Sequence, residues 1–402
     1  MKDSKWGKVN VPKGRLCFKG FLRHRLSAPI SAGFLRTPSL KVGVGALLRQ
    51  NRGYFMKRSF FKTLMGMGWA PLLVGLFGAF ANVAFAEERF SFEKAEMGLP
   101  VRVTLYASDE KVASAAVDAA FARIEVLNAI FTDYDSDSEL CRLSDTSGGG
   151  RAVRVSPELW HVLEYARRLS QRSNGAFDMS IGPVVNLWRT ARRKKALPSP
   201  ERLKEALARS GYDGMRLDGE HQTVELTKPR MRLDAGGIAK GYAMEEALLV
   251  LKKNGFPRAM VEGGGDIALG DAPTGQVGWS VEIIALDAEG APAPVRLRLS
   301  NCFVSTSGDL YQRLEIAGKR YSHIVDPRTG IGLTDHSLVT VIAARGMEAD
   351  ALSKVVAVLG AEAGFPVIDE TPGAACRVVR APGGTVEVRQ SSRWERLVEV
   401  SK

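Results

Sequence analysis

Apolar and polar residues alternate along residues 100–107, a pattern typical of a half-buried strand. Beyond Asp109 the apolar residues recur at helical spacing as far as about Phe131, which predicts a helix with Asp109 as its N-terminal cap. Two more helices are predicted at Ser-Pro-Glu sequences, each of which supplies a capping serine followed by a first-turn proline. The first runs from Ser156 to Ser173, and the second starts at Ser199 and ends at Ser210-Gly211.

Two short extended runs, 223–227 and 230–233, precede a third region of helical spacing. The second run ends in Leu233-Asp234, and the helical pattern that follows closes at Asn254-Gly255. The sequence therefore predicts a strand that passes through a turn into a helix, with a carboxylate at the strand end.

Gly236, Gly237 and Lys240 lie where this helix is expected to start. Glycines allow the backbone to approach a ligand closely, and first-turn N–H groups together with a lysine favour a phosphate. The spacing matches neither the Walker motif nor the dinucleotide-binding motif. An anion-binding turn and a purely structural turn are both consistent with these residues.

Strands dominate the predictions for the rest of the chain. Residues 258–270 are expected to form a strand with a glycine turn, and Ala317–Arg320 is expected to be the turn of a hairpin between 314–316 and 321–325. A helix is expected to open at 348–354 and to end at Gly360. Further strands are predicted at 279–285, 294–299, 302–306, 338–344, 375–380, 385–390 and 394–400.

The net charge of +12 would favour a nucleic-acid or membrane partner, but the charge is unevenly distributed. Residues 1–86 carry fifteen Lys and Arg residues and one acidic residue, so the remaining chain is nearly neutral. This distribution removes the main support for nucleic-acid binding. The length allows one large domain or two ordinary ones.

Residues 56–86 have the plan of a secretory signal peptide, with a basic start, an uncharged apolar run and Ala84-Phe85-Ala86 as a cleavage site. The basic start resembles a twin-arginine signal with lysine for the first arginine, and general secretory export stays open. An uncleaved run would be long enough to act as a membrane anchor. Residues 1–55 precede a second start methionine, so we expect an over-extended gene prediction or a disordered segment. The mature protein, residues 87–402, is expected to be soluble and periplasmic.

The four cysteines, at positions 17, 141, 302 and 376, form no Cys-x-x-Cys motif. Cys17 would be lost with the leader, which leaves an odd number in an oxidising compartment. One disulfide with one free thiol is compatible with this count, but buried free cysteines are the preferred interpretation.

Candidate chemistry in the first half of the chain lies on predicted loops. Residues 132–140 form an acidic segment that lacks the glycine and glutamate of an EF-hand, and Tyr134 within it could stack on a flat ligand. Phe177 and Asp178 follow a helix end, where functional residues often lie. The charge run Arg189–Lys195 is better explained as a solvated face than as a phosphate or membrane patch.

Candidate chemistry in the second half includes both acidic and basic groups. Asp266 follows three glycines and could be an acceptor or a turn cap, and Ser305–Asp309 is a hydroxyl-rich turn. A lone strand histidine is usually structural, and a role of His323 as a base is the second interpretation, supported by its neighbours Ser307, Asp309 and Asp326. Asp350 in a first helical turn either complements the helix dipole or holds a hard divalent cation.

In their order along the chain, these motifs resemble those of the ApbE family of FAD:protein FMN transferases. The resemblance runs from Met97-Gly98 to about Gly360 and depends on the joint order of the motifs. They are Tyr134–Leu140, Gly175–Asp178, Gly182-Pro183, Leu187-Trp188, Leu233–Tyr242, Gly264–Asp266, Ser305–Asp309, Ser322–Gly330 and Ala349–Leu352. The resemblance implies an α+β fold with mixed or antiparallel sheets and flanking helices around an FAD cleft.

The resemblance also implies roles for individual residues. The Gly237 carbonyl and the Asp350 carboxylate would bind Mg²⁺. His323 would be the catalytic base, with Asp309 or Asp326 as its helper. The flavin site would be lined by Met97, Tyr134, Ala176, Phe177, Asp178, Asp234, Lys240, His323 and Ile324.

The implied reaction is a phosphoryl transfer in which Mg²⁺ neutralises charge on the FAD pyrophosphate. A base would prepare a threonine hydroxyl of a partner flavoprotein, FMN would become joined to that threonine, and AMP would leave. Exported relatives serve membrane redox complexes or nitrous oxide reductase maturation, so we expect an acceptor of one of these kinds.

Two positions depart from the family pattern. Lys354 stands where the family usually has a threonine, four residues after the metal aspartate, and Glu262 stands where asparagine is common. A protonated ammonium cannot ligate Mg²⁺ and would repel it. It could replace part of the ion's charge, or point outward while water completes the shell. Three functions therefore stay open: Mg²⁺-dependent FMN transferase, which is preferred, flavin-binding protein without transfer, and FAD pyrophosphate hydrolase.

Overall fold

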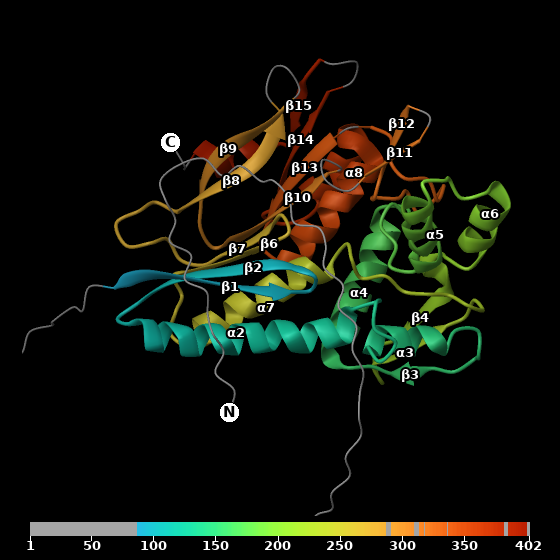
Figure 1. The fold of residues 1–402 in the computed structure, drawn as a ribbon, viewed down its shortest axis with the longest axis horizontal. Helices are drawn as coiled ribbons and strands as arrows, with labels where there is room; N and C mark the ends of the chain where they lie inside the picture. The colour runs from blue at the N-terminus through green and yellow to red at the C-terminus, as the bar shows by residue number, and fades with distance from the viewer. Residues whose placement is uncertain are drawn as a thin grey trace, which may run out of the picture. The chain divides into compact units, whose positions relative to one another are not determined.

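The computed structural model describes residues 87–286, 291–308, 313–316, 318–335, 337–381 and 385–399 (Figure 1). The predictions for residues 1–55 and 56–86, and the predicted roles of Asp309, lie outside these ranges. The fold is therefore described for the unit that contains residues 87–402.

An eight-stranded sheet, antiparallel at every pairing, forms the centre of this unit. Alternate residues of its middle strands face opposite layers: Val261 and Val341 belong to one apolar core, and Met260 and Ile342 belong to another. Both faces of the sheet are therefore buried. In spatial order the strands are β1 (Glu88–Glu96), β2 (Leu99–Ala107), β6 (Ala259–Gly263), β7 (Asp266–Leu269), β10 (Cys302–Gly308), β13 (Ser337–Ala343), β14 (Ala375–Arg380) and β15 (Glu387–Gln390).

Three long helices cover one face of the sheet. They are α2 (Glu110–Phe131), α7 (Ala239–Lys253) and α8 (Gly346–Asp369), and they contact successive strands from β1 to β14. Among the described helices only α8 is long and apolar enough to cross a membrane, but its contacts with β10, β13 and α7 are those of a core helix. The predicted end at Gly360 corresponds to a break in α8, where φ is +75°, and a second helical segment follows.

The starts of α7 and α8 touch backbone to backbone. A Cβ atom added to Gly241 would lie 2.1 Å from the carbonyl oxygen of Gly346, so only glycine allows this approach. Glu245 of α7 then caps α8, because its Oε2 accepts a hydrogen bond of 2.8 Å from the Gly346 N–H. The same carboxylate pairs with Arg345 at 2.6 Å. These contacts fix the two helix starts relative to one another.

The hairpin of β8 (Trp279–Leu286) and β9 (Pro292–Leu299) and the short helix α9 (Trp394–Glu399) contribute to the core on the other face. Trp279 and Trp394 are both buried there. The predicted strand at 394–400 is wrong over its described residues, because 394–399 are helical. A helical turn can bury the Trp394 side chain in this apolar cluster as well as a strand can, so the apolar pattern did not distinguish the two.

The remaining elements form a second group that contains four helices and two small sheets. The predicted strand at 230–233 is wrong, because Arg232 makes only an isolated bridge with Ile181. The helix α5 was not predicted, since glycine, proline and a run of cations obscure its pattern. This group comprises α3 (Glu139–Asp145), α4 (Pro157–Arg172), α5 (Gly182–Lys194), α6 (Pro200–Ala208), a 3₁₀ turn (Tyr212–Gly214), the sheet β3 (Val153–Arg154), β5 (Thr223–Leu226) and β4 (Met215–Asp218), and the hairpin β11 (Arg313–Ile316) and β12 (Lys319–Ser322).

The capped helices are confirmed. Asp109 caps α2, Ser156 caps α4 and Ser199 caps α6, and each side chain accepts a hydrogen bond from a first-turn backbone N–H.

The three cysteines in the described residues are free thiols, with Cys141 and Cys376 buried and Cys302 half-buried. Helices beside antiparallel sheets confirm the α+β class.

Candidate active site

The turn between Asp234 and α7 is built from local hydrogen bonds. The Asp234 N–H donates to the Met179 carbonyl at 2.7 Å, and one Asp234 carboxylate oxygen accepts from the Gly236 N–H at 2.8 Å. The Ala239 N–H donates to the Ala235 carbonyl at 2.9 Å, which begins the helix. The sequence-based prediction of a carboxylate followed by a helix start is confirmed here, although no strand leads into it.

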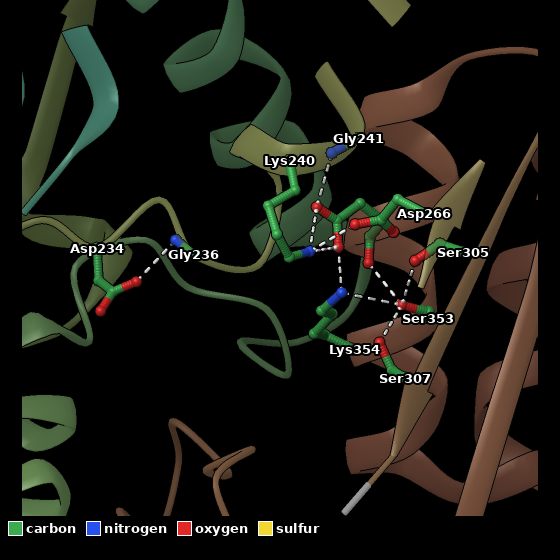
Figure 2. A network of polar contacts seen from close by, with 10 residues as sticks. Asp234, Gly236, Lys240, Gly241, Asp266, Ser305, Ser307, Ser353 and Lys354 are labelled. Atoms are coloured by element: carbon green, nitrogen blue, oxygen red, sulfur yellow. Dashed lines mark hydrogen bonds and ion pairs between the residues drawn. The ribbon is translucent and has the colours of Figure 1, made fainter. Parts of the chain in front are cut away.

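Four charged side chains meet beside this helix start (Figure 2). Lys240 pairs with Asp266 at 2.6 Å and lies 3.4 Å from both carboxylate oxygens of Asp350. The Lys354 ammonium contacts Asp350 as well, and the Gly241 N–H donates to Asp350 at 3.0 Å. Asp350 is fully buried, whereas the lysine side chains are 24% and 17% exposed. Two cations and two anions thus form a compact group that solvent reaches from the lysine side.

Protonation follows from this arrangement. Burial alone would raise the pKa of Asp350, but the ammonium groups of Lys240 and Lys354 outweigh it and hold the pKa at about 2. Burial and the charge of Asp350 raise the pKa of Asp266. Burial acts to lower the pKa of Lys240, but the charges of Asp266 and Asp350 outweigh burial and raise this pKa above its ordinary value. Lys240 therefore stays charged. Asp350 is therefore a firmly ionised carboxylate at neutral pH.

Three buried serines on β10 and α8 contact this charged group and one another. Ser305 and Ser307 are two residues apart on β10, so both face α8, where Ser353 lies 2.7 Å from Ser307 and 3.5 Å from Ser305. The Ser353 hydroxyl is within hydrogen-bonding distance of the Asp350 carbonyl at 2.7 Å and of the Lys354 ammonium at 3.3 Å. These hydroxyls provide polar surroundings for the buried part of the Lys354 side chain.

A second charged group surrounds Asp234. Its carboxylate accepts from Arg189 at 3.2 Å, and the same guanidinium also pairs with Asp133. The guanidinium stacks on the ring of Tyr134 with 4.5 Å to the ring centroid, while Tyr134 itself is 82% exposed. Burial and the charge of Asp133 raise the pKa of Asp234. Arg189, expected to belong to a solvated face, is instead half-buried and joins two of the predicted motifs.

The segment Ala176–Asp178 is buried. The Asp178 carboxylate accepts from the Ser180 N–H at 2.7 Å, and burial raises its pKa. Phe177 lies against the glycine turn, because a Cβ atom on Gly237 would be 3.4 Å from its ring. Phe177 therefore lies at the start of α7, as the predicted site requires. The Asp178 carboxylate stabilises the turn that its own segment forms.

The remaining predicted site residues lie on two hairpin regions. Met97 occupies the two-residue turn between β1 and β2 with φ of +50°. His323 and Ile324 follow β12, and the Ile324 N–H donates to the Ser322 hydroxyl at 3.0 Å. Asp326 forms a two-point ion pair with Arg328, with both distances 2.9 Å, so it stabilises its own turn. The roles of these residues toward flavin stay predictions.

A cavity of about 480 Å³ is lined in part by Pro183 and Leu187 of the predicted motifs. It is lined mainly by α3, α5 and α6 and contains four arginines, of which Arg209 pairs with Glu205 at 3.2 Å and Arg232 with Asp145 at 2.7 Å. None of the predicted site residues lines it. The candidate site is therefore assigned to the charged group around Lys240 and Asp350.

Comparison with known proteins decides the family. The family model described as "ApbE family" matches residues 97–378, which is most of the chain. This chain belongs to the ApbE family.

Similar ApbE proteins carry one activity in their names. An "FAD:protein FMN transferase" of Haemophilus influenzae is 32% identical over 283 residues, which are 69% of this chain and 81% of the relative. A protein of the same name from Treponema pallidum is 31% identical over 319 residues, or 74% of this chain and 88% of the relative.

Solved ApbE structures share the fold. The "Flavin Transferase ApbE from Vibrio cholerae" superposes with a TM-score of 0.69 at 26% identity and covers 77% of this chain and 99% of that protein. The apo form of the Pseudomonas stutzeri flavinyl transferase ApbE gives 0.68 at 28% identity and covers 78% and 98%. The predicted ApbE-like fold is confirmed.

The donor set that the ApbE resemblance assigns to Mg²⁺ does not fit a divalent cation in this chain. Both Asp350 oxygens already accept from nitrogen donors, and one contacts the Lys354 ammonium, which has no lone pair to offer. Magnesium requires near-octahedral oxygen ligands.

Proposed function

We propose that this protein is an FAD:protein FMN transferase that modifies a threonine of a partner flavoprotein. Membership of the ApbE family and the shared name of its relatives support the activity. The observation that supports this site is the pair of partly exposed lysines, Lys240 in the first turn of α7 and Lys354 on α8, which both contact Asp350. Ammonium groups beside helix N–H groups suit a bound pyrophosphate.

In the proposed reaction the threonine Oγ attacks the phosphorus atom of the FMN half of FAD. A new P–O bond forms, the P–O bond to the bridging oxygen breaks, and AMP leaves with that oxygen. His323 is the proposed acceptor of the hydroxyl proton. Lys240 and Lys354 stabilise the charge that develops on the phosphoryl oxygens.

The site around Asp234 is the proposed flavin-binding half. Tyr134 presents an exposed ring that is held by Arg189 on one face, which suits stacking of a flat heterocycle. Phe177 packs against Gly237, which lies between Asp234 and Lys240 in the chain. One ligand with a ring system and a pyrophosphate would span both halves.

We also propose that the protein is exported and acts in the periplasm on a subunit of a membrane redox complex or on a nitrous oxide reductase maturation factor. The signal-like sequence of residues 56–86 supports export. Cell fractionation tests this location, and a protein found only in the cytoplasm would contradict it.

The transferase proposal is tested by mixing the full-length protein with FAD and an acceptor domain that carries an Asp-Gly-x-Ser/Thr-Gly/Ala-Thr sequence. Mass spectrometry of the acceptor is expected to show the gain of one FMN. The matched control is an acceptor with valine in place of the final threonine, which should stay unmodified. His323→Gln is expected to slow transfer by about a hundredfold or more while FAD still binds.

Two results would overturn the proposal. Free FMN and AMP with an unmodified acceptor would identify an FAD pyrophosphate hydrolase. Bound FAD with no product would identify a flavin-binding protein.

A further inference from the structure

Lys354 lies one helical turn after Asp350 on α8, and its ammonium contacts the carboxylate predicted to bind a metal. The rest of its side chain lies beside the glycine turn, because a Cβ atom on Gly237 would be 3.6 Å from its Cγ atom. Lys354 therefore contacts the Asp350 carboxylate and lies beside Gly237, the two residues predicted to supply metal ligands. The lysine and a bound cation would compete for the same place.

Charge balance favours the lysine. Lys240 and Lys354 balance Asp266 and Asp350, so the group is neutral as it stands. In the absence of FAD, a divalent cation would bring the total to +2 in a largely buried volume, where like charges repel strongly. With an uncharged residue at position 354 the total would be −1, which is a favourable setting for a divalent ion. The identity of residue 354 thus decides which cation the group accepts.

The surroundings hold the Lys354 side chain in place by polar contacts. Its ammonium has Asp350 and the Ser353 hydroxyl as partners, and Ser353 is in turn joined to Ser307 at 2.7 Å. The side chain is only 17% exposed, so its charge acts in a partly desolvated place. An ammonium held in this way supplies a fixed positive charge to any anion at the start of α7.

We propose that the Lys354 ammonium takes the place of a divalent cation, so that this protein binds FAD without Mg²⁺. The inference rests on the proposed function, since it concerns how the pyrophosphate is held. Lys240 and Lys354 would donate hydrogen bonds to the pyrophosphate oxygens, while Asp266 and Asp350 keep both lysines oriented and balance their charge. Lys354 here is a binding residue, not a ligand to a metal.

The test compares FAD affinity with and without Mg²⁺, measured by quenching of flavin fluorescence. For the full-length wild-type protein, the Kd for FAD in EDTA is expected to equal that in millimolar Mg²⁺. For Lys354→Thr, the Kd in EDTA is expected to rise about tenfold or more, and Mg²⁺ is expected to restore it. Lys354→Arg keeps the charge and is expected to bind FAD independently of metal.

Lys253→Thr is the matched control, because Lys253 is exposed on the same helix as Lys240 but at its far end. It is expected to behave as the wild type. Titration of the wild-type protein with Mn²⁺, followed by electron paramagnetic resonance, gives a second readout that needs no variant and no flavin. Only weak, non-saturating Mn²⁺ binding is expected.

A wild-type protein that binds FAD only in Mg²⁺, or that holds Mn²⁺ tightly in competition with Mg²⁺, would overturn the inference and leave the transferase proposal standing. No FAD binding under any condition would instead contradict the proposed function. The two failures are therefore distinguishable.

Discussion

Two aspartates accept similar backbone hydrogen bonds, one from the turn before α7 and one from its first turn, yet their pKa values are shifted in opposite directions. Asp234 accepts from the Gly236 N–H at 2.8 Å, and Asp350 accepts from the Gly241 N–H at 3.0 Å. Nevertheless the pKa of Asp234 is raised and that of Asp350 is lowered to about 2. Burial raises both, so the difference must come from the charged neighbours.

The neighbours differ in number. Asp350 and Asp266 share two ammonium groups, whereas Asp234 and Asp133 share the single guanidinium of Arg189. One group is neutral and the other carries a net negative charge. A backbone N–H therefore positions an aspartate, but the number of cations in contact with its carboxylate decides how firmly it stays ionised. Asp350 contacts two ammonium groups, whereas among the described residues Asp266 pairs with Lys240 alone and its pKa is raised like that of Asp234.

The largest difference is expected from removing each carboxylate charge. Asp350→Asn leaves two ammonium groups with one partner and should lower the free energy of unfolding by roughly 3 to 5 kcal/mol, the usual cost of breaking a buried ion pair. Asp234→Asn relieves repulsion from Asp133 and should change it by less than about 1 kcal/mol. Urea unfolding at pH 7 measures both values. Equal losses in the two variants would break the comparison.

The two glycine donors should respond differently to an added methyl group. Gly241→Ala places a Cβ 2.1 Å from the Gly346 carbonyl oxygen and should cost about 1–3 kcal/mol or more, since backbone must move. In Gly236→Ala the nearest atom is the Asp234 carboxylate oxygen at 3.0 Å, which can rotate away, so a loss below about 1 kcal/mol is expected. Thermal unfolding of both variants checks the order, and an equal loss would contradict it.

Lowering the pH should change the contributions of Asp350 and Asp234 to the free energy of unfolding in opposite directions. The folded-state pKa of Asp350, about 2, lies below its ordinary value of 3.8, so its contribution of roughly 2 kcal/mol is present above pH 4 and is lost as the pH falls toward 2. The pKa of Asp234 is raised, so the folded state gains stability as the pH falls through that pKa. The difference in unfolding free energy between the wild type and each Asn variant, followed against pH, measures both. Slopes of the same sign would refute this assignment.

Features set by local chemistry could be predicted from the sequence. The caps at Asp109 and Ser156, and the turn that joins Asp234 to α7, depend only on neighbouring residues and were predicted with nearly the observed bounds. The prediction of a strand from 394 onward was wrong, because apolar residues that alternate over only a few positions do not distinguish a strand from one helical turn.

Features that depend on strand pairing and packing could not be predicted from the residues themselves. The pairing of Ser305 with Asp266 sets β10 beside the lysines, and nothing local to either strand specifies that register. The half-buried position of Arg189 depends on a helix that the charge run concealed. The conflict at Lys354 was visible in the sequence only because the family resemblance supplied an expected threonine.

The direct backbone contact between Gly241 and Gly346 makes the gap between α7 and α8 stiff. Lys240 and Asp350 lie within one helical turn of that contact, and a Cβ on either glycine would meet backbone atoms, so no side chain there can compress or repack. A gap of fixed width selects ions by radius. In the Lys354→Thr variant, the fixed gap is therefore expected to favour the small Mg²⁺ over the larger Ca²⁺, which prefers wider and more flexible cages.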